Sequence, residues 1–261
     1  MKGTIIKAIK ILAARKIIFC SEADFQFALA WEIKNLCPNA QIFLEKAVNV
    51  NNDTYYVDLI VVWENKYFFI ELKYQTSSFS TIDVLGLPLN LKGQAAEDLM
   101  RYDYLKDILR LYKIANSHPI NFGGGYAIIL SNDKLMYEAP KAFKRSLDCF
   151  FRIHDRRGFL NDRFPVPGAV VWNNATKGSS HWTRKPLRNL IFVLPLINTE
   201  WDTYLSIKSN QKKQEFKFLI NEVNTRCASL IQEYKDENER DKILILLNEL
   251  SMESAENPIK E

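Results

Sequence analysis

The sequence of 261 residues predicts an α/β fold in which a central mixed β-sheet is flanked by helices. Two segments rich in β-branched and aromatic residues, 55–63 and 67–74, are separated by a short polar turn and are typical of an antiparallel hairpin. Segments with helical character lie before and after this hairpin, at 21–36 and 91–114. A chain of this length that is 47% hydrophobic can bury a full core in one large domain.

The predicted helices begin at the N-terminus. Residues 1–20 alternate apolar residues with lysine and arginine, which predicts an amphipathic helix. Ser21 with Asp24 three positions later resembles a capping box, so Glu22 is predicted to be the first residue of the next helix. At about 100° per residue, Glu22 falls on the apolar face of that helix.

The predicted core continues with strands. A strand is expected at 41–48, followed by the two hairpin strands, and 125–130 indicates a further strand after the helix at 91–114. These elements place the core of the fold within residues 21–135.

The C-terminal half predicts an α/β extension of the same domain. Residues 136–210 form a basic segment in which 169–172 and 189–194 read as strands that extend the core sheet. Residues 211–261 are expected to form C-terminal helices, at 211–234 and 241–250.

Three charged residues, Asp58, Glu71 and Lys73, interrupt the apolar hairpin strands. Counting by two puts Glu71 and Lys73 on one face of the second strand and Leu72 on the other. Burying an unpaired carboxylate costs several kcal/mol of free energy, so we expect a cation to lie beside these acids. Mg²⁺ suits it, because it prefers oxygen ligands and usually takes only one or two carboxylates. The alternative is a structural ion pair between Glu71 and Lys73, with Asp58 satisfied by hydrogen bonds.

Asp58, a gap of twelve residues and then Glu71-Leu72-Lys73 resembles the signature of the PD-(D/E)XK phosphodiesterase superfamily, which contains restriction endonucleases, DNA-repair nucleases and junction resolvases. The order of helix, three-stranded meander, crossing helix and further strand is similar to the core of that superfamily. The resemblance implies a restriction endonuclease-like core and a metal-dependent nuclease, a DNA endonuclease of restriction, repair or defence type. The alternative is a catalytically inactive nucleic-acid-binding module that keeps the nuclease fold.

The resemblance also implies roles for individual residues. Asp58, Glu71 and the Leu72 carbonyl would hold Mg²⁺, with Mn²⁺ as a substitute. Lys73 would orient or help to deprotonate the attacking water and stabilise the transition state. Glu22 corresponds to a glutamate that many members place on this helix near the metal; otherwise it complements the helix dipole, a contribution of about 0.3–1 kcal/mol.

Further polar residues are candidates for the same site. Gln94, expected near the start of the crossing helix, would orient the attacking water or contact a phosphate, unless it lies on a solvated helix face. Some exonuclease-like members carry a tyrosine four residues after this glutamine, but Asp98 stands there, so no subfamily is assigned. Glu32 and Glu45 are alternative acids to Glu22.

The distribution of charge indicates a nucleic-acid partner, with DNA favoured over RNA. The net charge is only +4, but residues 141–163 hold seven Lys or Arg against three Asp, and 171–190 hold four Lys or Arg and no acid. Basic loops are also common on soluble proteins. The residues predicted to contact nucleic acid are Lys92, Arg152, Lys177, Trp182, Arg184 and Lys185. A homodimer is expected if both strands are cut.

Cysteine usage and hydropathy predict a cytoplasmic protein without a membrane partner. The four cysteines are widely separated and show no spacing typical of a disulfide framework or a zinc site. The N-terminal segment contains no uninterrupted apolar run of signal-peptide or transmembrane length.

Overall fold

The computed structural model describes residues 1–83, 85–94, 97–138, 168–172, 190–195, 201–209, 212–225 and 232–233. Its N-terminal elements are α1 (Lys2–Ala14), α2 (Glu22–Leu36), β1 (Gln41–Val50), β2 (Asp53–Trp63) and β3 (Lys66–Gln75). Next come β4 (Phe79–Ile82), β5 (Pro88–Leu91), α3 (Glu97–Ser117), β6 (Phe122–Ser131) and α4 (Lys134–Tyr137). The remaining elements are β7 (Gly168–Trp172), β8 (Leu190–Pro195), β9 (Asp202–Ser209), β10 (Lys212–Val223) and β11 (Gln232–Glu233).

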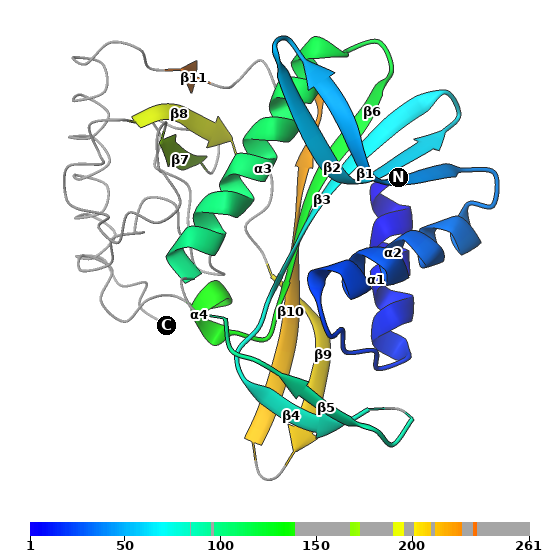
Figure 1. Ribbon diagram of the computed structural model, residues 1–261, viewed down its shortest axis with the longest axis vertical. Coiled ribbons are helices and arrows are strands. Elements are labelled where there is room, and N and C mark those ends of the chain that lie inside the picture. Colours follow the sequence, from blue (N-terminus) through cyan, green and yellow to red (C-terminus); the bar gives the residue numbers. More distant parts are fainter. Residues whose placement is uncertain are drawn as a thin grey trace, which may run out of the picture.

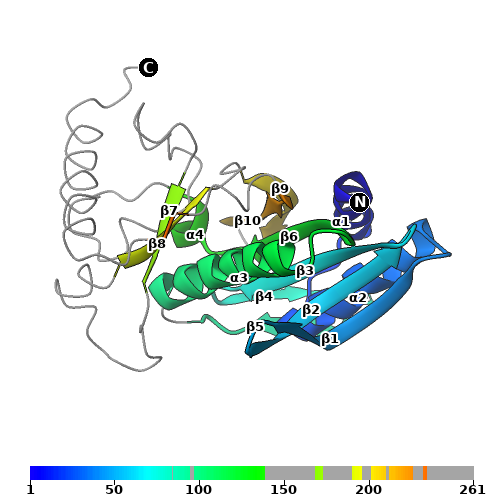
Figure 2. The ribbon, with the colours of Figure 1, turned by 90° about the horizontal axis from the view of Figure 1, so that it is seen from above.

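A six-stranded sheet in the order β1-β2-β3-β6-β10-β9 forms the centre of the molecule. β3 and β6 run parallel, whereas the other neighbouring strands are antiparallel. α3 covers one face of this sheet, and α1 and α2 cover the other (Figures 1 and 2). The predicted α/β fold with a central mixed sheet flanked by helices is therefore confirmed.

Two apolar cores, one on each face of the sheet, hold the layers together. Ile70 and Leu72 of β3 are fully buried in the core beneath α1 and α2. Phe69, which precedes Ile70, belongs to the core beneath α3. Because successive side chains of a strand point to opposite faces, Glu71 and Lys73 lie on the α3 face.

α2 begins at the predicted residue, whereas α1 ends at Ala14, before the predicted boundary at residue 20. The Ser21 hydroxyl accepts a hydrogen bond of 3.1 Å from the Asp24 N–H, and Glu22 begins α2. α1 buries one stripe of its surface in the α1/α2 core, through Ile5 and Ile9 among others. In the part of the chain that the structure describes, no helix is long and apolar enough to cross a membrane.

The segment between β3 and α3 differs from its prediction. Leu91, expected at the start of the crossing helix, is the last residue of β5, which pairs with β4 in a hairpin. The described part of α3 begins at Glu97. The predicted start of this helix at residue 91 is wrong, because Leu91 pairs with Phe79 and is buried as a strand residue.

The C-terminal predictions are partly wrong. The helix expected at 211–234 is a strand over 212–223, because β10 lies between β6 and β9 and is buried on both faces. The strands expected at 169–172 and 189–194 exist as β7 and β8, but they form a separate three-stranded sheet with β11. The core sheet is extended by β9 and β10 instead. The helix predicted at 241–250 lies outside the described residues.

Candidate functional site

The site lies where β2 and β3 diverge. The two strands pair as far as Leu59 opposite Ile70, whereas β3 continues alongside β6 to Gln75. Asp58 and Glu71 are thus the first residues of their strands beyond the last paired position. From there to its end, the β2-facing edge of β3 has no strand partner within the described chain.

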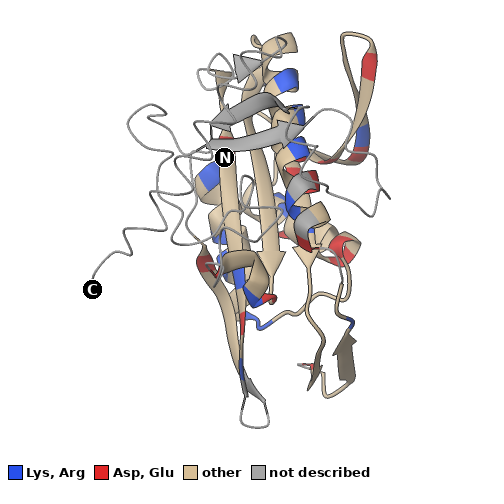
Figure 3. Cartoon of the chain, turned by 90° about the vertical axis from the view of Figure 1, so that its left-hand side faces the viewer, with Lys and Arg blue, Asp and Glu red and all other residues tan. Residues whose placement is uncertain are grey.

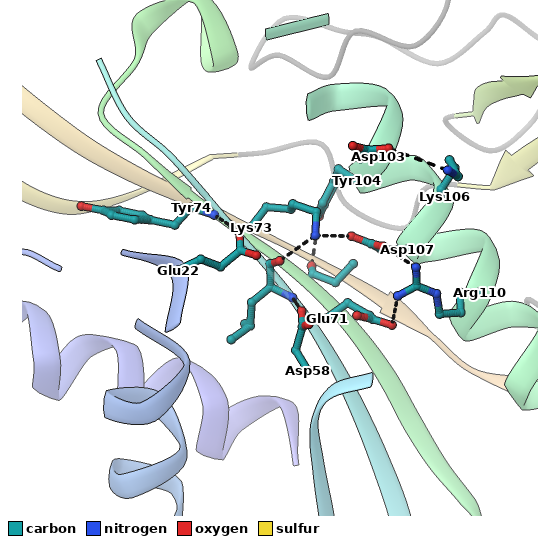
Figure 4. Close-up of polar contacts among 12 residues, drawn as sticks. Glu22, Asp58, Glu71, Lys73, Tyr74, Asp103, Tyr104, Lys106, Asp107 and Arg110 are labelled. Atoms are coloured by element: carbon teal, nitrogen blue, oxygen red, sulfur yellow. Dashed lines mark hydrogen bonds and ion pairs between the residues drawn. The ribbon is translucent and has the colours of Figure 1, made fainter. Parts of the chain in front are cut away.

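Two carboxylates take the place of the missing strand (Figure 4). The Leu72 N–H donates to Asp58 Oδ2 at 2.6 Å, and the Tyr74 N–H donates to Glu22 Oε2 at 2.8 Å. Buried backbone N–H groups need an acceptor, so these contacts explain why acids from β2 and α2 turn toward β3. They bring Asp58 and Glu22 to positions on either side of Lys73.

Residues of α3 complete the cluster. Lys73 Nζ donates to the Leu72 carbonyl at 3.0 Å and lies 2.8 Å from Asp107 Oδ2. Glu71 Oε1 accepts from Arg110 Nη1 at 2.7 Å, and Arg110 Nη2 lies 3.3 Å from Asp107 Oδ1. Acidic and basic groups therefore alternate along Glu71, Arg110, Asp107 and Lys73. The ion pairs that the structure describes for Glu71 and Lys73 join each of them to α3, so the direct Glu71–Lys73 pair considered from the sequence is not the arrangement observed.

Burial sets the electrostatics of the acids in this cluster. Desolvation raises the pKa of Glu22, Asp58 and Asp107 above the ordinary values. Burial and the nearby Asp107 raise the pKa of Glu71 to about 9, although Arg110 opposes the shift. The four acids outnumber the two cations, so the cluster favours the uptake of protons or of a further cation.

The two cations keep their charge. Burial lowers the pKa of Lys73, but the neighbouring Asp107 and Glu22 outweigh it and leave the pKa above its ordinary value. Burial likewise lowers the pKa of Arg110, and Glu71 and Asp107 more than restore it. Lys73 is thus a protonated donor in this arrangement and not a free base.

The predicted metal ligands offer oxygen atoms of the right chemistry. Among the described residues, no group of three or more His, Cys, Asp and Glu side chains is placed to hold a metal ion. The predicted set has two carboxylates, Asp58 and Glu71, and the Leu72 carbonyl, which fits an ion that keeps several waters. Glu71 and the Leu72 carbonyl accept hydrogen bonds from Arg110 and Lys73, so a bound ion would require these donors to shift.

Gln94 and Lys92 lie beyond the end of β3. Gln94 precedes the described start of α3 at Glu97, so its predicted place on the helix is wrong. Its side-chain oxygen accepts from the Thr76 N–H at 3.2 Å, and its carbonyl accepts from the Gln75 side chain at 3.2 Å. The Lys92 carbonyl accepts from the Thr76 hydroxyl at 2.8 Å. Both residues are exposed, and these contacts tie the β5–α3 connection to β3.

The two alternative acids have different neighbours. Glu32 pairs with Arg15 and joins α2 to the residue that follows α1. Glu45, in β1, accepts a hydrogen bond of 2.8 Å from the Gln26 amide, which also donates to the Asp58 carbonyl at 2.5 Å. Glu45 therefore borders the site, whereas Glu32 is engaged elsewhere.

The other residues predicted to contact nucleic acid are outside the described residues. They are Arg152, Lys177, Trp182, Arg184 and Lys185.

Asp107 and Arg110 are site residues that the sequence analysis did not select. They are three positions apart on α3, next to the fully or almost fully buried Tyr104, Ile108 and Leu111. Figure 3 shows acidic and basic residues close together along α3. The sequence pattern could have identified them, because an acid and a base three residues apart lie beside the apolar stripe of the helix. Charged side chains next to a buried stripe need partners of opposite charge.

No protein-family model, no curated protein and no solved structure matches this chain.

Proposed function

We propose that this protein is a metal-dependent nuclease with a restriction endonuclease-like core, and that it hydrolyses phosphodiester bonds in DNA. The observation that carries the proposal is the open edge of β3, where two carboxylates, Asp58 and Glu22, accept backbone N–H groups on either side of Lys73. Glu71 of β3 lies at the same place, so carboxylates from α2, β2 and β3 meet where a cation would be held.

The order of the elements supports the same proposal. The residues that resemble the PD-(D/E)XK signature lie on the second and third strands of a meander, which follows α2. A crossing helix, α3, then leads to β6, which runs parallel to β3. This is the order that the resemblance implies, over the half of the chain that contains the signature.

The residues divide the chemistry among them. Asp58, Glu71 and the Leu72 carbonyl would hold Mg²⁺ or Mn²⁺, which when bound neutralises charge on the phosphate and makes a coordinated water more acidic. Lys73 keeps its proton, so its part is to hold the attacking water and to stabilise negative charge on the phosphate. Asp107, on α3, holds the Lys73 ammonium in position through its ion pair.

The test is cleavage of plasmid and of labelled single-stranded and double-stranded DNA with Mg²⁺ or Mn²⁺, compared with EDTA. We expect cutting only with the metal, and we expect Lys73→Met to slow it about 100-fold or more, because a preorganised charge is lost at the reacting phosphate. Lys106→Met, which changes a half-exposed lysine of α3, is the matched control and should cut normally. Equal activity of the Lys73 variant and the wild type would refute this mechanism.

The alternative is a nucleic-acid-binding module without turnover. The observation in its favour is that Glu71 and Lys73 already have ion-pair partners on α3, Arg110 and Asp107. This alternative predicts DNA binding in EDTA that weakens with salt, together with no cleavage in either metal.

A further inference from the structure

A groove of about 580 Å³ opens on the α3 face of the sheet. Its walls come from β1, β2, β3 and the connection from α3 to β6. Ile60 and Phe69 line it, and each lies two positions along its strand from a residue of the candidate site, Asp58 and Glu71 respectively. Two residues of a strand span roughly 7 Å, so the groove begins beside the carboxylate cluster.

Three aromatic rings make one wall of the groove. Tyr67 and Phe69 stack with centroids 6.3 Å apart and an interplanar angle of 19°. Phe69 and Phe122 stack at 5.6 Å and 14°. Tyr67 is 40% exposed, so one end of this near-parallel row is open to a ligand. Flat, exposed aromatic rings are surfaces on which nucleic-acid bases stack.

The charges that line the groove favour a base inside it and a phosphate near Lys46. Among the described residues no acid lines the groove, whereas Lys46 does, with its Nζ 3.8 Å from the centre of the Phe43 ring. α3 ends at Ser117 in the same lining, and the C-terminal end of a helix carries partial negative charge. That end disfavours a phosphate within the groove and favours hydrogen-bond donors, such as the ring N–H of thymine or the amino groups of other bases. Lys46 is then the cation available to the strand's phosphates.

We propose that the groove binds one unstacked nucleobase of a DNA strand, so that the adjoining phosphate lies at the carboxylate cluster. The inferred position of that phosphate rests on the proposed nuclease function, whereas the inferred stacking of the base rests on the aromatic rings alone. The substrate class is accordingly single-stranded DNA, or the frayed end or loop of a duplex, in which a base is free to leave its neighbours.

The test measures binding in EDTA, where cleavage does not contribute. The probes are a short fluorescein-labelled oligo-dT and a matched oligonucleotide in which the bases are replaced by abasic sites. We expect Tyr67→Ala to weaken binding of oligo-dT by about tenfold, as expected for the loss of one base–aromatic stack, and to leave the abasic probe unchanged. Tyr67→Phe should bind like the wild type.

Tyr56→Ala is the matched control, because Tyr56 lies on β2, is 62% exposed and does not line the groove. Its affinity for both probes should equal that of the wild type. The proposal is overturned if Tyr67→Ala binds oligo-dT as the wild type does, if it weakens both probes equally, or if the wild type does not prefer oligo-dT to the abasic probe. If binding depends on the bases and on Tyr67 but no DNA is cleaved in Mg²⁺ or Mn²⁺, base binding in the groove is supported and the proposed nuclease activity is refuted.

Discussion

Replacing Glu71 by glutamine is expected to abolish metal-dependent cleavage and, in EDTA, to make the folded protein more stable than the wild type. Glu71 is 1% exposed, so ionising it there has a large desolvation cost, which Arg110 offsets in part. Glutamine has nearly the same shape as the neutral acid and carries no charge. It is also a poor substitute for a carboxylate that must hold Mg²⁺.

The gain in stability should depend on pH in a defined direction. The pKa of Glu71 is raised from 4.5 to about 9, so between these values the folded protein retains a proton that the unfolded chain releases. The stability that the neutral carboxyl contributes is complete below the lower value and is lost as the pH rises through the higher one. Because glutamine does not titrate, the variant's advantage in the free energy of unfolding should grow from about pH 5 to about pH 9.

Urea unfolding in EDTA across this pH range and cleavage assays in Mg²⁺ measure the two effects. Glu138→Gln changes an exposed glutamate that pairs with Lys134 four residues earlier, and it should alter neither quantity. A Glu71→Gln variant that is less stable than the wild type and still cuts DNA would show that Glu71 is a structural partner of Arg110 and not a metal ligand.

Replacing Asp107 by alanine is expected to destabilise the fold by about 3–5 kcal/mol, because it leaves two partly buried cations without their shared carboxylate. The Asp107 side chain is only 5% exposed and contacts both Lys73 and Arg110. Asp107→Asn, which keeps a polar group of the same shape, should cost less. Both variants should also slow cleavage, since Lys73 loses the partner that holds its ammonium.

Asp103→Ala is the control for this prediction. Asp103 lies one turn earlier on α3 and pairs with Lys106 at 3.8 Å, with both side chains much more exposed. Loss of such a surface pair should change the free energy of unfolding by about 0–1 kcal/mol. If chemical denaturation gives the same change in the free energy of unfolding for Asp107→Ala as for Asp103→Ala, the buried ion pairs of Asp107 do not stabilise the fold.

The meander and part of the site could be predicted from local sequence. β2 and β3 contain long runs of β-branched and aromatic residues, and a polar turn separates them, so their pairing follows from side chains alone. Asp58, Glu71 and Lys73 stood out because charges are rare in such strands. The structure brings them together with Glu22, whose place at the start of α2 followed from the Ser21 cap.

The rest depended on tertiary contacts. β10 carries Lys, Gln and Glu at its start, which favour a helix, but burial between β6 and β9 overrides that local preference. The partners of Glu71 and Lys73 come from α3, more than thirty residues further along the chain. The divergence of β2 from β3 is a property of backbone pairing, which the side-chain pattern does not reveal.

We expect the acids at the β3 edge that faces away from β6 to bind a divalent cation, and anomalous diffraction from crystals soaked with Mn²⁺ measures this directly. We predict one peak bounded by Asp58, Glu71 and the Leu72 carbonyl, with Arg110 moved away from Glu71. Crystals of Glu71→Gln should lack it. Wild-type crystals without a peak there, in which Glu71 still pairs with Arg110 and Lys73 with Asp107 at high Mn²⁺ concentration, would show that these residues do not form a metal site.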